Sequence, residues 1–576
     1  MRVASSNLVI RSPRTPVNDL LAGVLTFSSQ CARPFHPFDW VPRAASRCRV
    51  DSASDWLPGG SRLGVRDETR PETGAVGGAA LSAPPRRATR ARVVRCARVV
   101  RCGRSFDVDG RSTMEATAVA GYGRGSSLSS STMEGTLMVG GALRMASMDD
   151  LDLRMSEGVR PLYEAVKTFI RDEVDPITEE FHRLGAGRDD RWSWAPGQLE
   201  LLETVKAKAR AQGLWNFFLP NAETGQGLSN LDYAYIASEL GKNRLASECL
   251  NCSAPDTGNM EVLERVGTPE QKAQWLQPLL DGEIRSAYVM TEPGIMSSDA
   301  KQIQTSAILD GDEWVINGSK FYASGAGDPR CKIMIVMVRT SPDADTYKQQ
   351  SQILVPKDTP GVEIVEGMQV FGSDDAPHGH MHIRFNDVRV PKSNVLWGEG
   401  KGFEISQLRL GPGRIHHCMR SIGTAERAIE MMVDRGMSRE GFGKKLINLG
   451  KNMEVISRAR IEVEAMRLMV LRAAKAMDTL GNAEARVWVS AVKAMVPEKC
   501  CDIIDEAIQM HGAAGISQWF PLAEMWHAQR TLRLADGPDE VHHQVVGRAE
   551  AKNRESDRAA GKQDDFRPGG RLFTGP

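Results

Sequence analysis

Several features that mark common protein classes are missing from this 576-residue chain. It has no run of about 18 apolar residues, the length that a membrane-spanning helix requires, so no membrane span is expected. It has no Gly-x-x-x-x-Gly-Lys-Ser/Thr loop and no glycine-rich turn between a strand and a helix, so ATP or NAD binding is not indicated. It has no net charge either, with 73 basic and 73 acidic residues, which argues against a nucleic-acid-binding protein.

Lysine is absent before Lys167, and this absence reveals an uneven distribution of charge. Residues 1–147 contain 21 arginines and 11 acidic residues, a net charge of +10, so residues 148–576 carry a net charge of −10. The first part is rich in Ser, Gly, Pro and Arg, and it has no sustained helical or strand periodicity. This composition predicts a disordered, low-complexity leader over 1–147. It favours a leader over a nucleic-acid-binding arm, because aromatic residues do not interleave with the arginines.

The extreme N-terminus has a signature of its own. Arg2, Arg11 and Arg14 stand in an acid-free stretch with several serines, which is typical of a mitochondrial transit peptide. Mitochondrial localisation is therefore expected, with a peroxisomal or a cytoplasmic location as the alternatives; residues 573–576 form no Ser-Lys-Leu signal. The other interpretation is that translation begins at one of four later methionines, namely Met114, Met133, Met145 and Met148.

Regular hydrophobic periodicity begins near Met155 and changes twice along the chain. Helical spacing is followed by short alternating or β-branched runs, and helical spacing then returns. The predicted regions are an N-terminal helical domain over 148–285, a middle β domain over 286–397, a C-terminal helical bundle over 398–550 and a polar tail over 551–576. Asp310-Gly311-Asp312 and Asn317-Gly318 are predicted turns between strands.

Specific motifs lie on this framework in a fixed order. They are 267–282 (GTPEQKAQWLQPLLDG), 290–293 (MTEP), 297–299 (SSD), 317–320 (NGSK), 439–443 (REGFG) and 509–512 (QMHG). Together they resemble the flavin-dependent acyl-CoA dehydrogenase family over about residues 155–550. Four more segments, 251–260, 375–380, 410–417 and 535–542, resemble the branch that contains family members 10 and 11. Those relatives often carry a preceding kinase-like domain; residues 1–147 stand in its place, so only the dehydrogenase part is expected.

The resemblance implies a fold, a reaction and a cofactor. The fold is α+β, with an N-terminal helical domain, a middle β-barrel or sheet domain and a C-terminal four-helix bundle. The reaction is α,β-dehydrogenation of an acyl-CoA thioester of long or branched chain in fatty-acid β-oxidation: a carboxylate takes the α-proton and the β-hydrogen leaves as hydride to N5 of FAD. The implied partners are an electron-transfer flavoprotein and further copies of the chain, in a dimer or homotetramer with shared flavin sites.

Asp536 is the candidate general base. Most relatives carry Glu in an Ile-Tyr-Glu-Gly-Thr segment where this sequence has Leu-Ala-Asp-Gly-Pro over 534–538. An Asp side chain is about 1.5 Å shorter, and reacting groups tolerate little displacement, so the backbone or the substrate must lie closer. A pKa raised by exclusion of water would suit the base. The alternative structural interpretation is an N-cap on a helix that starts at Pro538.

The resemblance also assigns flavin and substrate contacts. The flavin candidates are Met290 and Thr291 at the isoalloxazine ring, Ser297 or Ser298 at the phosphates, Tyr322, Ala323 and Ser324 over N5, Arg439 and Phe442 at the pyrophosphate of a neighbouring subunit, Gln509 and Gly512 at a neighbour's adenylate, and Pro538 and Glu540. The substrate candidates are Ser298 and Arg414. Each residue alone has an ordinary structural interpretation, but the ordered set favours a flavin site.

Two positions depart from the family pattern. Gly450 stands where relatives have a flavin-binding Gln, and Gly411 stands where they have an Asp, three residues before Arg414. These departures keep open a non-catalytic, flavin-binding assembly subunit. Nitroalkane oxidases in the superfamily also use an Asp as base, so a flavin oxidase that acts on acyl-CoA or nitroalkanes is a second alternative.

Histidines and cysteines predict no metal site. His378, His380 and His382 alternate along one predicted strand, but no acidic or thiol cluster completes a coordination sphere. The adjacent pairs are expected to have structural roles, namely His416-His417 and His542-His543. The ten cysteines include the adjacent Cys500 and Cys501, which suit no ordinary disulfide and fit a reducing compartment.

Overall fold

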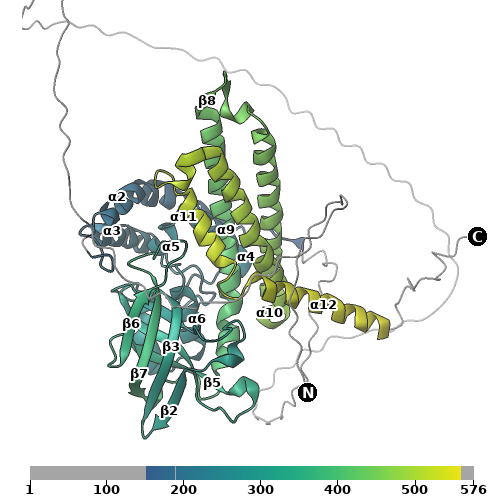
Figure 1. The fold of residues 1–576 in the computed structure, drawn as a ribbon. Helices are drawn as coiled ribbons and strands as arrows, with labels where there is room; N and C mark the ends of the chain where they lie inside the picture. The colour runs from purple at the N-terminus through teal and green to yellow at the C-terminus, as the bar shows by residue number, and fades with distance from the viewer. Residues whose placement is uncertain (1–150, 189, 560–576) are drawn as a thin grey trace, which may run out of the picture. The chain divides into compact units, whose positions relative to one another are not determined.

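The computed structural model describes residues 151–188 and 190–559. The predicted leader over 1–147 and most of the tail lie outside these residues. Helices come first, a seven-stranded sheet follows, and long helices complete the described part (Figure 1). This order confirms the predicted α+β succession of a helical, a β and a second helical region.

The N-terminal region is built from short helices. Its helices are α1 (Arg160–Phe169), α2 (Asp175–Ala186), α3 (Gln198–Ala211), α4 (Asn230–Leu240), α5 (Ala246–Cys249), α6 (Asp256–Val266), α7 (Pro269–Gln271) and α8 (Gln277–Leu280). Local sequence explains several helix starts. Ser229 caps α4 by accepting a hydrogen bond from the Asp232 amide, and Thr268 with Gln271 forms a capping box at α7.

The middle region is one sheet. Its strands are β1 (Arg285–Val289), β2 (Ser306–Asp310), β3 (Glu313–Ser324), β4 (Cys331–Arg339), β5 (Gln350–Pro356), β6 (Val362–Gly367) and β7 (His380–Pro391). The order is β1-β4-β2-β3-β7-β6, and β5 pairs with β4. β4 is almost wholly buried, as its unbroken apolar run requires, whereas β7 alternates between buried and exposed residues. The short alternating or β-branched runs at 314–316, 333–338, 351–355, 362–365 and 380–385 all lie within observed strands.

One predicted turn is wrong. Asn317 and Gly318 do not end a strand; they lie inside β3, where its pairing with β7 shifts register after Ile316. Gly318 has φ 153°, and a Cβ at this position would lie 2.5 Å from the Thr305 hydroxyl oxygen. An Asn-Gly pair serves a β-bulge as well as a turn, because both need a backbone that glycine adopts easily. The other predicted turn, at 310–312, does connect β2 to β3.

The C-terminal region contains the longest helices. They are α9 (Gly402–Ser438), α10 (Asn452–His511), α11 (Leu522–Leu532) and α12 (Asp539–Ala559), with a small hairpin of β8 (Glu440–Gly441) and β9 (Lys444–Lys445) after α9. The residue range of α10 contains a sharp reversal at Gly481, which has non-helical angles of φ 78° and ψ 167°. The chain therefore runs as two helices there. In Figure 1 the β8 hairpin lies at the opposite end of the bundle from the sheet.

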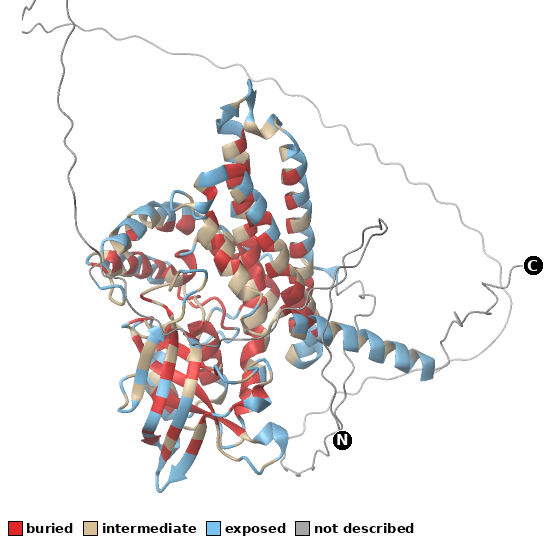
Figure 2. Cartoon of the chain, in the orientation of Figure 1, coloured by how far each residue is buried: buried red, intermediate tan, exposed pale blue. Residues whose placement is uncertain are grey.

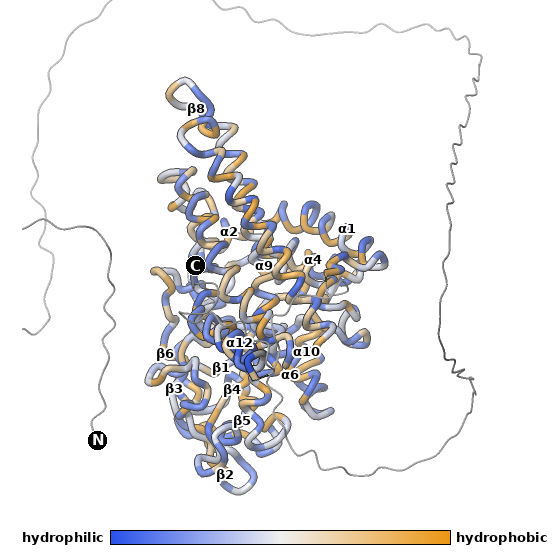
Figure 3. Tube along the Cα trace, turned by 90° about the vertical axis from the view of Figure 1, so that its right-hand side faces the viewer, coloured by the Kyte–Doolittle hydropathy of each residue, from blue (hydrophilic) through white to orange (hydrophobic). Residues whose placement is uncertain are grey.

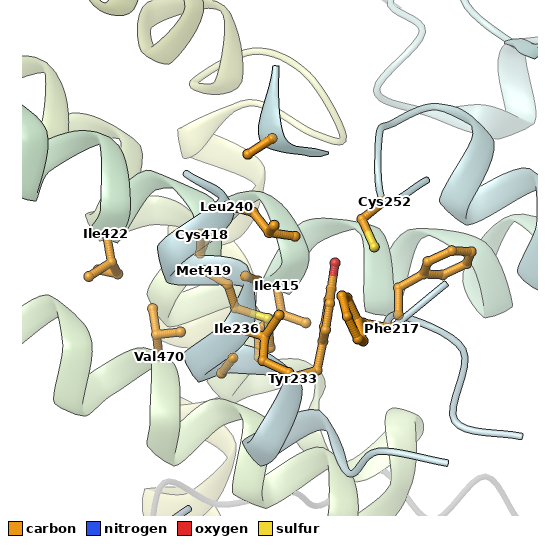
Figure 4. Packing of buried hydrophobic residues seen from close by; sticks show 14 of the residues in the cluster. Phe217, Tyr233, Ile236, Leu240, Cys252, Ile415, Cys418, Met419, Ile422 and Val470 are labelled. Atoms are coloured by element: carbon orange, nitrogen blue, oxygen red, sulfur yellow. The ribbon is translucent and has the colours of Figure 1, made fainter. Parts of the chain in front are cut away.

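The N-terminal helices and the bundle share one hydrophobic core, and the sheet has another. In Figure 2 the buried residues gather where α4, α9 and α10 face each other. Figure 4 shows part of this contact, with Tyr233 and Ile236 of α4 against Ile415 and Met419 of α9. The two backbones touch at Gly423, where a Cβ would lie 1.8 Å from the carbonyl oxygen of Ser238. Only glycine permits that approach.

The cysteines in the described residues serve packing. Cys249 and Cys252 have C-x-x-C spacing, but both are buried, free thiols. Burial raises the pKa of Cys252 to about 11, so it is a protonated, apolar side chain at neutral pH. Within 151–188 and 190–559, no helix combines the length and apolar content needed to cross a membrane, and the long helices mix hydrophobic and hydrophilic positions (Figure 3).

Candidate active site

Asp536 lies in the loop between α11 and α12, with its backbone held from several sides. It has φ 56°, a left-handed conformation that is uncommon outside glycine. Its carbonyl oxygen accepts a hydrogen bond from Arg414 Nε at 2.8 Å and faces His542 Nε2 at 3.3 Å. Its own amide N–H makes no hydrogen bond with the described residues. The loop therefore presents one free donor beside the candidate base.

The buried Lys493 holds the loop that contains Asp536. Lys493 of α10 is fully buried, and its ammonium group donates to the carbonyl oxygens of Leu532 and, at 3.4 Å, Gly537. These two carbonyls flank Asp536 in sequence. Burial lowers the pKa of Lys493, so its charge depends on these carbonyls and on nearby acidic groups for stabilisation. Lys493 thus determines where the Asp536 backbone lies.

The Asp536 carboxylate faces two side chains of α9. Oδ1 is 3.8 Å from Arg409 Nη1, and Oδ2 is 3.5 Å from His417 Nε2. Burial lowers the pKa of His417 to about 3, so the ring is neutral at neutral pH. Arg420 donates to His417 Nδ1 at 3.2 Å, which leaves the ring proton on Nε2, facing Asp536. The N-cap interpretation of Asp536 is wrong, because α12 begins at Asp539 and the Asp539 amide donates to the Arg533 carbonyl at 3.2 Å.

The environment of Asp536 keeps it ionised. Burial acts to raise its pKa, but the positive charges of His417, Arg409, Arg414 and Lys493 outweigh burial, and the pKa of Asp536 lies below its ordinary value. His417 contributes to this shift only in its protonated form, below about pH 3. The expected raised pKa is therefore not observed. The group is ready to accept a proton without first losing one.

Arg409 connects the base to the edge of the sheet. It is buried on α9, its guanidinium carbon lies 4.0 Å from the centre of the Tyr288 ring of β1, and its Nε donates to Asn259 Oδ1 at 3.3 Å. A guanidinium over a tyrosine ring gains a cation–π attraction. Since Tyr288 lies close before Met290 and Thr291, this contact brings Asp536 to the end of β1 where the flavin-ring candidates begin.

The flavin-ring candidates occupy two adjoining segments. Thr291 donates through Oγ1 to the carbonyl oxygen of Phe321, and the Phe321 amide donates to the Thr291 carbonyl at 3.0 Å. Met290, with its carbonyl held by Lys320 Nζ at 2.9 Å, is half-buried. Tyr322 follows with φ 51° at a second register shift of β3, and it is 40% exposed. The bulge thus turns an aromatic ring outward beside Thr291.

An ion pair beneath these segments fixes their backbone. Lys320 Nζ lies 2.9 Å from Glu292 Oε1, and both side chains are almost wholly buried. Glu292 also accepts hydrogen bonds from the amides of Gln304 at 2.8 Å and Thr305 at 2.9 Å. Burial lowers the pKa of Lys320 to about 8, although Glu292 opposes that change. Removing one partner would leave a buried charge, so the pair locks the loop after β1.

Ala323 and Ser324 complete the end of β3. Ala323 is buried in the sheet core, and the half-buried Ser324 hydroxyl lies 2.8 Å from Nδ1 of His380 on β7. His380 Nε2 in turn lies 3.1 Å from Asp375 Oδ2. The histidines that alternate near β7 therefore have separate partners, since His382 Nε2 lies 2.9 Å from the Ser319 hydroxyl.

The two candidate phosphate serines differ in their environment. Ser297 Oγ accepts from the Glu292 amide at 2.8 Å and donates to the Glu292 carbonyl at 3.2 Å. Ser298 is exposed and makes no hydrogen bond with the described residues. The Ser297 hydrogen is thus used inside the turn, whereas the Ser298 hydroxyl is free to donate to an anion.

Four further candidates lie at the other end of the bundle. Arg439 follows the C-terminal end of α9, and Phe442 forms the tip of the β8 hairpin with φ 52° and 97% of its surface exposed. Gln509 and Gly512 lie at the end of α10. At 1.5 Å per residue, Arg439 is about 38 Å along α9 from Arg414. One chain therefore does not bring these four residues to Asp536.

Pro538 and Glu540 stand at the start of α12, directly after the base. Pro538 is half-buried and Glu540 is exposed. The two departures from the family pattern are open positions: a Cβ at Gly411 would have only Asn482 within 4 Å, at 3.9 Å, and a Cβ at Gly450 would have no described atom within 4 Å. Among the described residues, no other side chain occupies either position.

The arrangement fits a bound flavin. Tyr322, Thr291 and Ser324 offer an aromatic ring and hydroxyl groups at one edge of the sheet. Gly512 has φ 63° and ψ −144°, and a Cβ there would have no described atom within 4 Å, so its backbone is open to a ligand.

Several residues with evident roles in this site were not predicted from the sequence. Arg409, His417, Lys493, Asp375 and His380 all contact or orient a candidate residue. His417 and the 375–380 segment stood in recognised motifs, so those motifs were the available signal. Nothing in the sequence marked Lys493 or Arg409, which lie on helices among other charged residues.

The role of Lys493 gives a prediction. Lys493→Met keeps the packing volume but leaves the carbonyls of Leu532 and Gly537 without their donor. We expect kcat for the oxidation that the sequence resemblance implies to fall about a hundredfold, since a displacement near 1 Å has that effect, while flavin absorbance is retained. Lys206→Met is the matched control, because Lys206 is equally buried and donates to the Gly282 carbonyl at 3.1 Å, away from the site. It should lower stability and leave kcat unchanged; equal losses of kcat in both variants would contradict the assignment.

The family models match the described regions in order. Residues 156–283 match the acyl-CoA dehydrogenase N-terminal domain, residues 287–388 the middle domain and residues 400–551 the C-terminal domain. Among solved structures, a protein from Mycobacterium abscessus assigned to the acyl-CoA dehydrogenases is 47% identical, with a TM-score of 0.67, over 70% of this chain and 100% of that one.

Curated relatives show the same similarity. "Probable acyl-CoA dehydrogenase FadE2" of Mycobacterium tuberculosis is 51% identical over 67% of this chain and 95% of its own length. Mouse acyl-CoA dehydrogenase family member 10 is 50% identical over 69% of this chain, and mouse family member 11 is 49% identical over 68%. The chain spans only 37% and 50% of the lengths of those two mouse proteins.

Proposed function

This chain belongs to the acyl-CoA dehydrogenase family, and from that premise we propose that it catalyses FAD-dependent α,β-dehydrogenation of an acyl-CoA thioester of long or branched chain in fatty-acid β-oxidation. The observation that carries the proposal is the Asp536 carboxylate, kept ionised in a half-buried loop and joined through Arg409 to the end of β1. Thr291 and Ser324, at that end of the sheet, are the residues proposed to hold the flavin ring.

The residues of this chain divide the chemistry among them. Asp536 takes the α-proton of the thioester, and its free amide N–H donates to the thioester carbonyl, so that negative charge developing on the oxygen meets a fixed donor. Arg414, whose Nε donates to the Asp536 carbonyl, helps to hold the loop in place and would lie next to CoA when it is bound. FAD, when bound, accepts the β-hydride at N5.

We propose that the flavin sites are shared between subunits of a dimer or homotetramer. The end of α9, with Arg439 and Phe442, and the end of α10, with Gln509 and Gly512, lie near each other, because Phe520 packs against both Arg435 and His511. These four residues therefore suit the flavin of a neighbouring copy. Arg439 would pair with the pyrophosphate and Gly512 would admit the adenylate to its backbone. Ser298, with its free hydroxyl, is the better candidate for the phosphates of the chain's own flavin, Ser297 the lesser.

Stepwise bleaching of the flavin tests this proposal. The full-length protein, purified with its flavin, is mixed anaerobically with acyl-CoA thioesters of increasing length and branching, and the flavin absorbance is recorded. We expect loss of absorbance with long or branched chains and little with short ones. A flavin-containing protein that no acyl-CoA bleaches would favour a non-catalytic assembly subunit instead.

The use of Asp as the base favours one alternative, a flavin oxidase on the same scaffold. In that case the bleached flavin would be reoxidised rapidly by air. For the dehydrogenase that we propose, reoxidation should be slow in air and fast with an electron-transfer flavoprotein, the proposed electron acceptor in mitochondria. A nitroalkane added in place of acyl-CoA distinguishes a nitroalkane oxidase from an acyl-CoA oxidase, because only the nitroalkane oxidase should be bleached by it.

A further inference from the structure

Three hydrogen-bonded side chains end at the position proposed for the flavin ring. Ser324 of β3 and His380 of β7 are directly opposite each other in the antiparallel ladder, so their side chains lie on the same face of the sheet. The Ser324 hydroxyl is 2.8 Å from His380 Nδ1, and His380 Nε2 is 3.1 Å from Asp375 Oδ2. All three side chains are partly buried, and the acid–histidine–hydroxyl order is continuous.

The acid determines which nitrogen of His380 carries the proton. Burial acts to raise the pKa of Asp375, but the hydrogen bond from His380 and the charge of Arg244 outweigh burial and lower it to about 2. An ionised carboxylate only accepts hydrogen bonds, so His380 Nε2 donates to it. In the tautomer that carries its one proton on Nε2, Nδ1 has only a lone pair, and the Ser324 hydroxyl donates its hydrogen to Nδ1.

The groups around His380 do not compete with this arrangement. His378 lies 6.4 Å away between ring centres and Tyr322 6.2 Å away. His527 of α11 approaches Asp375 Oδ1 at 3.8 Å, and Arg244, before α5, is ion-paired with Glu524. Burial lowers the pKa of His378 to about 4 and also lowers the pKa of His527, so both are neutral at neutral pH. Asp375 is the sole carboxylate bonded to His380 within the described residues.

The direction of the Ser324 hydroxyl has a consequence for the cofactor. Its hydrogen points to His380, so its oxygen offers only lone pairs toward the site. An oxidised flavin has a lone pair at N5, whereas a reduced flavin carries N–H there. An oxygen that only accepts therefore matches the reduced form and finds no hydrogen to give to the oxidised form.

We propose that Asp375 and His380 are positioning residues that hold the Ser324 hydroxyl as a hydrogen-bond acceptor toward the flavin, and thereby favour the reduced cofactor. This inference rests on the proposed function, since it places Ser324 at N5. It assigns a role to the 375–380 segment beyond packing. It also explains why Ser324 and His380 must share one register across β3 and β7.

Asp375→Asn tests the inference because it changes one acceptor into a donor with little change in shape. In the wild type the Ser373 hydroxyl donates to Asp375 Oδ1 at 3.3 Å. In the variant the amide oxygen can accept this hydrogen bond, which directs the amide NH₂ to His380 Nε2. His380 must then carry its proton on Nδ1 and donate to Ser324, which frees the hydroxyl hydrogen for oxidised N5. The gain of about one hydrogen bond should shift the reduction equilibrium about tenfold toward oxidised flavin, a fall of about 30 mV for a two-electron couple.

The measurement is a spectroscopic redox titration of the flavin-loaded, full-length protein against a reference dye, without acyl-CoA. In a Ser324→Ala background, Asp375→Asn should no longer move the potential, because the hydroxyl through which it acts is missing. His382→Gln is the matched control, since it breaks the Ser319–His382 hydrogen bond between the same two strands. That variant should keep the wild-type potential.

The outcomes separate this inference from the proposed function. A wild-type potential in Asp375→Asn overturns the inference alone, and so does an equal shift with and without the Ser324 hydroxyl, which would indicate a general structural effect. A full-length protein that binds no flavin overturns the proposed function and the inference with it. A tenfold shift that disappears in the double variant supports the assignment of both residues.

Discussion

Asp536→Asn is expected to lower the rate of α-proton exchange of acyl-CoA by roughly a thousandfold to ten-thousandfold, while the flavin stays bound. Asn has nearly the same shape but does not accept a proton at neutral pH. The ionised carboxylate lies 3.8 Å from Arg409 Nη1 and 3.5 Å from His417 Nε2. The measurement is incorporation of deuterium at the α-carbon in D₂O, read by mass spectrometry.

Two further variants make this result specific. Asp536→Glu restores a carboxylate of the length that most relatives carry, so exchange should return at least in part. Asp505→Asn changes an exposed aspartate on α10 and should leave exchange unchanged. Wild-type exchange in Asp536→Asn would remove Asp536 from the mechanism, whatever the flavin does.

Much of the fold could be predicted from hydrophobic periodicity alone. β4 is buried on both faces, so its sequence is an unbroken apolar run. α9 is buried mainly along one face, so its apolar residues recur at helical spacing. The Asn317-Gly318 pair shows where this reasoning fails. Its backbone requirement is the same in a turn and in a bulge, and only the pairing of β3 with β7 decides between them.

The candidate site was less predictable, since its contacts join distant segments. Lys493 reads as one charged residue of a long helix, and it becomes significant only because α10 passes under the loop at 532–537. His416 and His417 are neighbours in sequence, yet His417 faces Asp536, whereas His416 faces Glu261 at 4.0 Å. Helix geometry sends adjacent side chains about 100° apart, so one motif serves two environments.

A buried charge cluster at the start of the sheet is the other place where one substitution should have a large effect. Arg285, the first residue of β1, lies 2.7 Å from Glu248 and 2.8 Å from Asp256 and is almost wholly buried. Asp256 also accepts from the amide and the hydroxyl of Ser286, both at 2.6 Å. Helices α5 and α6 are thereby fixed to the strand that leads to the active site.

Arg285→Met should lower the free energy of unfolding by roughly 3–5 kcal/mol, because it leaves two buried carboxylates short of a cation. Urea unfolding at one protein concentration measures the change. The matched control is Arg389→Met on β7, whose ion pairs with Asp310 and Glu313 are half-exposed. It should have a much smaller effect on the free energy of unfolding, because solvent screens exposed ion pairs. Equal losses in the two variants would mean that burial does not govern these ion pairs.

The pH dependence of unfolding gives an independent check on the same cluster. Burial acts to raise the pKa of Glu248, but Arg285, Arg330 and Lys206 outweigh burial and lower it from 4.5 to about 2. A lowered folded-state pKa contributes stability that is complete above about pH 4.5 and is lost as the pH falls toward 2. Without Arg285 the pKa of Glu248 should return toward its ordinary value. The variant should therefore lose less stability than the wild type between pH 4.5 and 2, and an unchanged acid dependence would contradict the pairing of Arg285 with Glu248.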